Sequence, residues 1–158
     1  MIKGTVRRMN DGLVKSTQDG LGAKFKRIYL DSWVAIAWLK WKLKNKTKPQ
    51  VIDYLEKIVC EKIVSDLVKE ELKIVAKREF NFEILEDLWN EFLSSLNLKN
   101  IGNPLSLTPN NSDEFDDAHI KTARTEKEVI IITGDNKMIS KDDIVWFYGK
   151  LRKIHGED

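Results

Sequence analysis

The sequence has few cysteines, prolines and histidines: one, three and two among its 158 residues. A single cysteine, Cys60, excludes an intramolecular disulfide and any zinc site built from several cysteines. No apolar run approaches the roughly 20 residues that a membrane-spanning helix needs. The N-terminal stretch also lacks the hydrophobic region of a signal peptide. These absences predict a cytoplasmic protein without a membrane segment.

The charged residues are distributed unevenly, although the net charge is only +2. Residues 1–27 carry a net charge of +5, and five lysines without an acid give residues 40–48 another +5, which leaves −8 for the remainder. A basic edge beside an acidic body suits a nuclease that holds phosphates outside a carboxylate pocket. Two solvated lysine-rich stretches would give the same pattern, so both interpretations stay open.

The order of predicted elements indicates one α/β domain over residues 27–158, preceded by an irregular basic arm over residues 1–26. We expect strands near residues 27–30, 62–65, 105–107, 129–133 and 144–147. We expect helices near residues 32–43, after Pro49, from about Asp66, and over residues 82–96 and 113–125. Strands that alternate with helices predict a three-layer α/β/α sandwich around a mainly parallel sheet.

Acidic residues follow two of the predicted strands. Asp31 comes directly after the first strand. Asp135 follows the β-branched strand 129–133, from which one glycine separates it. In open α/β sheets, ligands bind in the crevice beyond the carboxyl ends of the parallel strands. Either acid alone could be an ordinary turn residue, but the two together predict a functional site at this edge of the sheet.

Two further acids are expected to reach the site from helices. Glu70 and Glu71 point about 100° apart on a helix, so at most one of them can face the crevice. Asp113 can serve as the N-cap of a later helix and Asp116 as a first-turn acid, and both roles are structural. Asp117 is harder to explain as a structural acid, which favours it as a site residue.

Four short motifs, in this order, resemble the acidic motifs of PIN-domain ribonucleases, a family that includes the toxins of VapBC-type toxin–antitoxin pairs. They are Ile28-Tyr29-Leu30-Asp31-Ser32, Ser65-x5-Glu71-Leu72, Asp117-Ala118-x-Ile120-x-x-Ala123 and Ile132-Thr133-Gly134-Asp135. The resemblance covers about residues 27–148. The family places its second acid before a leucine and its third before a small residue, which favours Glu71 over Glu70 and Asp117 over Asp116. The family's aromatic-ended turn after the last acid is replaced here by Asn136-Lys137-Met138.

The resemblance implies an endoribonuclease that hydrolyses RNA phosphodiester bonds with Asp31, Glu71, Asp117 and Asp135. It also implies supporting roles for two hydroxyl residues beside the acids (Ser32 and Thr133), a homodimer, and an antitoxin protein as a possible partner. Oxygen ligands without a cluster of His or Cys favour Mg²⁺ or Mn²⁺ over zinc. Such an ion lowers the pKa of a bound water and neutralises charge that develops on the phosphodiester. We assign Asp31 and Asp117 as the main ligands, completed by Glu71 and Asp135.

Two other interpretations of the acids have to be weighed against a nuclease. A PIN-like scaffold could bind RNA or a protein partner without cutting. A haloacid-dehalogenase-like phosphatase also places acids at strand ends, but it requires Asp-x-Asp after the first strand. The sequence Asp31-Ser32-Trp33 lacks the second acid, so the phosphatase is disfavoured.

The histidines and tryptophans are assigned structural roles. His119 lies two residues from Asp117 and faces away from it on a helix, which favours a packing or surface role; His155 in the tail is expected to be exposed. The tryptophans at positions 33, 38 and 41 could stack on RNA bases. Trp38 and Trp41 share an apolar stripe with Val34, however, which favours the core or a subunit interface.

Overall fold

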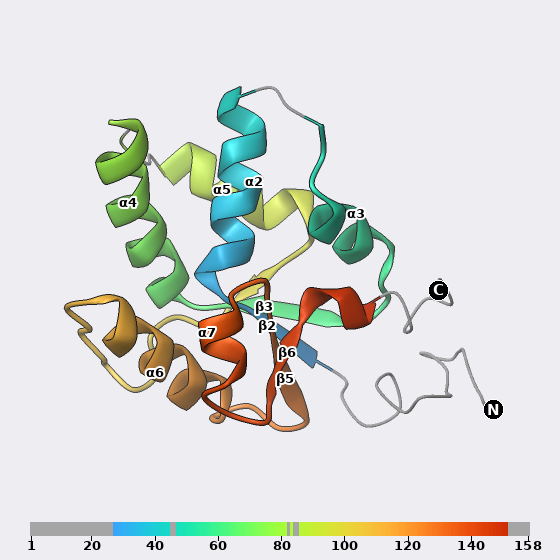
Figure 1. Ribbon diagram of the computed structural model, residues 1–158, viewed down its shortest axis with the longest axis vertical. Coiled ribbons are helices and arrows are strands. Elements are labelled where there is room, and N and C mark those ends of the chain that lie inside the picture. Colours follow the sequence, from blue (N-terminus) through green and yellow to red (C-terminus); the bar gives the residue numbers. More distant parts are fainter. Residues whose placement is uncertain (1–26, 45–46, 82, 84–85, 152–158) are drawn as a thin grey trace.

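The computed structural model describes residues 27–44, 47–81, 83 and 86–151 (Figure 1). The proposed arm of residues 1–26 and the tail with His155 lie outside this part of the chain. The described strands form one five-stranded sheet in the order β4-β3-β2-β5-β6, and all neighbouring pairs are parallel. The strands are β2 (Arg27–Leu30), β3 (Glu61–Val64), β4 (Lys99–Asn100), β5 (Val129–Thr133) and β6 (Val145–Phe147).

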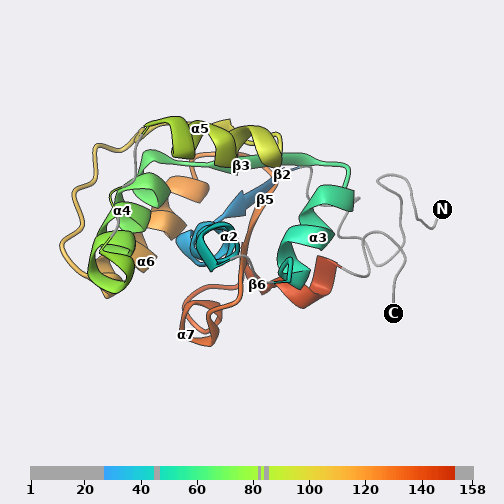
Figure 2. The same cartoon turned by 90° about the horizontal axis from the view of Figure 1, so that it is seen from above.

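Helices cover both sides of the sheet, as expected for a three-layer sandwich. Seen from above, α4 and α6 lie to one side of the sheet and α3 to the other (Figure 2). The helices are α2 (Ser32–Lys44), α3 (Gln50–Lys57), α4 (Asp66–Phe80), α5 (Glu86–Ser95), α6 (Ser112–Ala123), α7 (Asn136–Ile139) and the 3-10 helix η1 (Tyr148–Lys150). None of these helices is long and apolar enough to cross a membrane.

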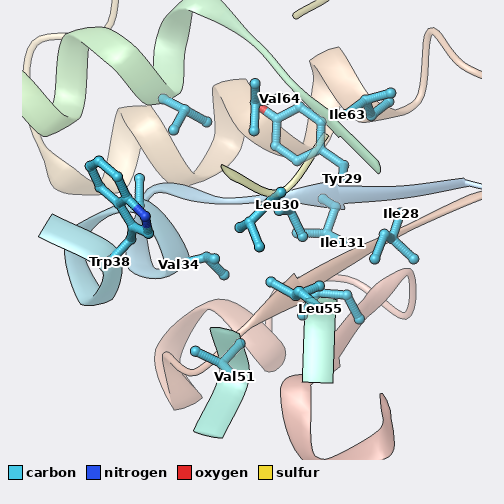
Figure 3. Close-up of a cluster of buried hydrophobic side chains, with 14 of the residues drawn as sticks. Ile28, Tyr29, Leu30, Val34, Trp38, Val51, Leu55, Ile63, Val64 and Ile131 are labelled. Carbon is cyan, nitrogen blue, oxygen red and sulfur yellow. The ribbon is translucent and has the colours of Figure 1, made fainter. Parts of the chain in front are cut away.

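The core forms because β2 and β5 are apolar on both faces and lie at the centre of the sheet. Every residue of β5 is buried, which confirms the expectation from its β-branched sequence. In Figure 3, Tyr29 points to one side of β2, whereas Val51 and Leu55 of α3 lie on the other side. Trp38 of α2 is fully buried in the same cluster, as its place on the apolar stripe predicted. The acids that follow these strands are therefore held by rigid elements.

The expected strand at residues 105–107 is wrong. Ser106 has a positive φ of 53°, and the segment around it forms a loop. The side chain of Asn103 donates to the carbonyl of Leu107 and accepts from its N–H, so local bonds replace strand pairing. The sheet is instead extended by the two residues of β4, and the short helix α7 after Asp135 was not expected.

The strand order creates a switch point at the centre of the sheet. The chain passes from β2 outward through β3 to β4, and then returns to the other side of β2 for β5 and β6. The connection that follows β2 therefore leads toward one edge of the sheet, and the connection that follows β5 leads toward the other edge. This divergence opens a crevice beyond the carboxyl ends of β2 and β5. Asp31 and Asp135 follow these two strands, so both lie beside the crevice.

Candidate active site

Asp31 occupies the floor of the crevice. It is 4% exposed, and its Oδ2 accepts a hydrogen bond of 2.7 Å from the hydroxyl of Thr133 at the end of β5. Its Oδ1 accepts from the N–H of Trp33 at 3.1 Å. The hydroxyl of Thr133 also accepts from the N–H of Asp135 at 3.0 Å. Thr133 therefore links the first and last of the predicted acids.

Glu71 reaches the same place from the second turn of α4. This helix is positioned by Ser65, whose hydroxyl accepts from the N–H of Leu67 as its N-cap. Glu71 Oε1 accepts a hydrogen bond of 2.5 Å from the hydroxyl of Ser32, the residue after Asp31. Glu70 instead pairs with Lys73 at 3.6 Å on the exposed side of the helix. The structure thus places Glu71, as expected, on the inner side of α4, next to Ser32, the residue after Asp31.

The third acid of the site is Asp116, which α6 turns toward the crevice. The residue is 6% exposed, and its Oδ2 is buried with no hydrogen-bond partner among the described residues. The side chain of Asp117 is 61% exposed and pairs with Lys141 at 3.2 Å. The expectation that Asp117 faces the crevice, with Asp116 as a structural acid, is therefore wrong.

The physical reason is the phase of α6. Its N-cap is Asn111, whose side chain accepts from the N–H of Glu114, so Asp113 lies in the first turn instead of capping it. Asp116 then falls in the second turn, three residues before the buried His119. Asp117 lies on the same exposed face of α6 as Asp113, which precedes it by four residues. One position along the helix rotates a side chain by about 100°.

Asp135 stands at the rim of the crevice, where it caps α7. Its Oδ1 accepts from the N–H of Lys137 at 3.0 Å, and its backbone N–H is held by Thr133. The residue is half-buried. Of the four predicted acids, the structure brings Asp31, Glu71 and Asp135 together, and it adds Asp116 in place of Asp117.

The pKa values report the crowding of these carboxyl groups. Burial, followed by the charges of Glu71 and Asp116, raises the pKa of Asp31 to about 7, although the Thr133 hydroxyl and His119 act against the rise. Burial, followed by the charges of Glu71 and Asp135, raises the pKa of Asp116 to about 6. Perturbed carboxyl groups that share a crevice are typical of functional sites, because burial and like charge both oppose ionisation.

His119 belongs to the site, although its sequence position favoured a packing or surface role. It is 1% exposed, and its Nε2 lies 2.9 Å from Glu71 Oε1. Its Nδ1 lies 2.7 Å from the hydroxyl of Tyr29, which in turn lies 2.6 Å from the hydroxyl of Ser65. Because a carboxylate only accepts, Nε2–H donates to Glu71. No local pattern in the sequence signals this contact, because His119 and Glu71 are 48 residues apart.

The donor set suits a hard divalent cation better than it suits any other cofactor. Carboxylate oxygens prefer Mg²⁺ or Mn²⁺, and the unpartnered Oδ2 of Asp116 is a buried acceptor that a cation would satisfy. Within the described residues, however, no three His, Cys, Asp or Glu side chains already meet in an arrangement that could hold a metal ion. Glu71 in particular is engaged by Ser32 and His119.

Comparison with other proteins does not place the chain in a family. No protein-family model matches it, and the search of curated proteins finds no relative. The site must therefore be interpreted from its own chemistry.

Proposed function

We propose that this protein is a metal-dependent endoribonuclease whose acids are Asp31, Glu71, Asp116 and Asp135. The observation that supports this most strongly is that the four carboxyl groups come from separate elements and converge at the switch point of a parallel sheet. Two of them have raised pKa values because they are buried near one another. A protein gains nothing in stability from such a cluster, so a ligand that neutralises it is the simplest reason for it.

Asp31 and Asp116 would hold the cation, with Glu71 and Asp135 completing its ligands directly or through water. A bound Mg²⁺ or Mn²⁺ supplies a water of lowered pKa as nucleophile and neutralises charge on the phosphodiester. Asp116 has a free buried oxygen, so it needs no bond broken before it binds. Glu71 has to turn from its present partners toward Asp31.

The neighbouring residues orient the acids. Thr133 fixes one oxygen of Asp31, and the N–H of Trp33 fixes the other. Ser32 and His119 both hydrogen-bond Oε1 of Glu71, and Tyr29 holds His119 in turn. Such outer partners set the direction of ligand lone pairs and tune affinity.

RNA as the substrate follows from the resemblance of the four motifs to those of PIN-domain ribonucleases. The same resemblance extends the proposal to a homodimer and to restraint by a small antitoxin protein. The alternative is a PIN-like scaffold that binds RNA or protein without cutting. It is favoured by the absence of a ready three-ligand group among the described residues.

RNA cleavage in Mn²⁺ tests the proposal against this alternative. The native chain should cleave a labelled, structured RNA with single-stranded loops, and EDTA should stop the reaction. Asp116→Asn should abolish cleavage, whereas the neighbouring Asp117→Asn, which changes the same charge on the same helix, should leave it nearly intact. A folded, pure sample that cleaves no RNA across varied substrates would leave only the scaffold.

A further inference from the structure

A hollow of about 410 Å³ lies along one face of α2. Residues at helical spacing form this face, and the start of the next helix closes it: Trp33, Ala37, Lys40, Trp41, Lys44 and Pro49 line it. Trp38, which was expected to share a structural role with Trp41, is fully buried, but Trp33 and Trp41 are only partly buried. We call this hollow the α2 groove.

The α2 groove combines aromatic surface with unpaired positive charge. Lys42 and Lys48 lie 5.4 and 5.6 Å from the ring centre of Trp41, but each is neutralised by a glutamate. Lys40 and Lys44 form no ion pair with any residue that the structure describes, and Lys44 Nζ lies 5.3 Å from the ring centre of Phe80. Glu79 of α4 interacts electrostatically with both lysines, and its carboxylate is also hydrogen-bonded by Arg78. No acidic residue lines the groove itself.

At one end of the groove, Trp33 contacts the segment that precedes Asp135. Trp33 follows Asp31 by two positions, and its indole lies so close to Gly134 that a Cβ at that position would overlap the ring. Gly134 in turn separates Thr133 from Asp135. The ring of Tyr148 stacks on the indole of Trp33, with 5.3 Å between the ring centres and 18° between the ring planes. Trp33 therefore joins the groove to the segment between Thr133 and Asp135.

The length of the groove matches a short piece of polynucleotide. Trp33 and Lys44 are eleven residues apart on one helix, which corresponds to about 16 Å along its axis. Basic side chains that track a backbone, together with an aromatic ring on which a base can stack, are the features by which proteins hold single strands. A paired base cannot offer its face to a tryptophan, so a duplex would not use Trp41.

We propose that the α2 groove binds the single-stranded segment of RNA next to the bond that is cut, with a base against Trp41 and phosphates at Lys40 and Lys44. The choice of RNA rests on the proposed function. The competing occupant is a second copy of the chain. A two-fold contact through this face would bring Lys40 and Lys44 of both copies together, and like charges oppose it.

Binding can be measured without cutting in an Asp31→Asn background, with fluorescence anisotropy of a labelled 12-nucleotide oligouridylate. The double variant Lys40→Glu with Lys44→Glu should weaken binding by about tenfold or more. It should also make the slope of log affinity against log salt shallower by about two. Trp41→Ala should weaken binding by about fivefold or more. The matched control is Lys77→Glu with Lys121→Glu, which makes the same charge change on α4 and α6 and should change affinity by less than about threefold.

Several results would overturn the groove as the RNA site. These are equal losses in the groove and control variants, duplex RNA bound as tightly and with the same dependence on Trp41, or tighter binding of a DNA strand of the same length. A groove variant that converts a dimer into a monomer would assign the groove to a second copy. Circular dichroism on each variant shows that it is folded.

The groove and the proposed function fail separately. If the native chain cleaves RNA but the groove variants bind like the control, the groove assignment is wrong and the nuclease stands. If binding depends on the groove but no metal-dependent cleavage is found, the nuclease is wrong and the single-strand site stands.

Discussion

Asp31→Asn should stabilise the metal-free protein at neutral pH while it abolishes RNA cleavage. Burial, aided by the charges of Glu71 and Asp116, raises the pKa of Asp31 from 3.8 to about 7. In the unfolded chain the same group ionises near pH 4. Between these values the folded state retains a proton that the unfolded state has lost. Stability is therefore fully present below about pH 4 and declines as pH rises toward 7.

The size of this effect follows from the shift. About three pKa units correspond to roughly 4 kcal/mol of unfolding free energy. For a domain of this length, 1 kcal/mol moves the melting temperature by about 2–4 °C. Asparagine carries no charge and keeps one oxygen that can accept from Thr133, so it removes the penalty of ionisation. Its NH₂ group cannot accept from the N–H of Trp33, and the loss of that bond offsets about 1 kcal/mol of the gain. The variant should melt about 6–12 °C higher than the native chain at pH 8 in EDTA, and at nearly the same temperature at pH 4.

Thermal unfolding followed by circular dichroism from pH 4 to pH 8 checks this prediction. Asp117→Asn is the control, because its side chain is exposed and should leave the profile of the native chain unchanged. Added Mn²⁺ should raise the melting temperature of the native chain more at pH 8 than at pH 5, since protons compete with the cation. Parallel profiles for the native chain and Asp31→Asn would refute the reasoning.

Three other substitutions test the remaining contacts of the site. Asp116→Asn should lower cleavage by at least about 100-fold, and equal activity in Asp116→Asn and Asp117→Asn would contradict the assignment. Gly134→Ala should cost about 1–3 kcal/mol of stability and reduce cleavage, because the new Cβ overlaps the indole of Trp33. Chemical denaturation measures this loss of stability, and an unchanged midpoint would count against the contact between Gly134 and Trp33. His119→Ala should lower the unfolding free energy by about 1–3 kcal/mol, because buried partners lose their hydrogen bonds, and a loss below 0.5 kcal/mol or so would show that these bonds are dispensable.

The sheet could be predicted from the sequence because its strands leave strong local signals. The β-branched run at residues 129–133 and the apolar run before Asp31 fix two central parallel strands, and parallel strands end at the same edge. That rule was sufficient to bring Asp31 and Asp135 together. The two-residue strand β4 carries no such signal, and its place was taken in the prediction by residues 105–107, where Asn103 forms a local loop instead.

The helical part of the site was harder to predict because helix phase depends on the cap. Motif spacing identified α6 as a source of a carboxylate but selected Asp117, one residue and about 100° from the buried Asp116. The residues three, four and seven positions after Asp116 are buried and lie on the same face of the helix as Asp116. Their spacing in the sequence would have selected Asp116. The contact between His119 and Glu71 joins two helices 48 residues apart in the chain, and no local pattern specifies it.

Anomalous diffraction from crystals grown with Mn²⁺ tests most directly whether the carboxyl groups form a metal centre. The expected result is a manganese peak in the crevice beyond β2 and β5, ligated by Asp31 and Asp116, with Glu71 turned away from Ser32. The same experiment on Asp31→Asn crystals should show no peak there. A native crystal without manganese at this position, or with manganese only at exposed carboxylates such as Asp117, would contradict a metal-dependent nuclease.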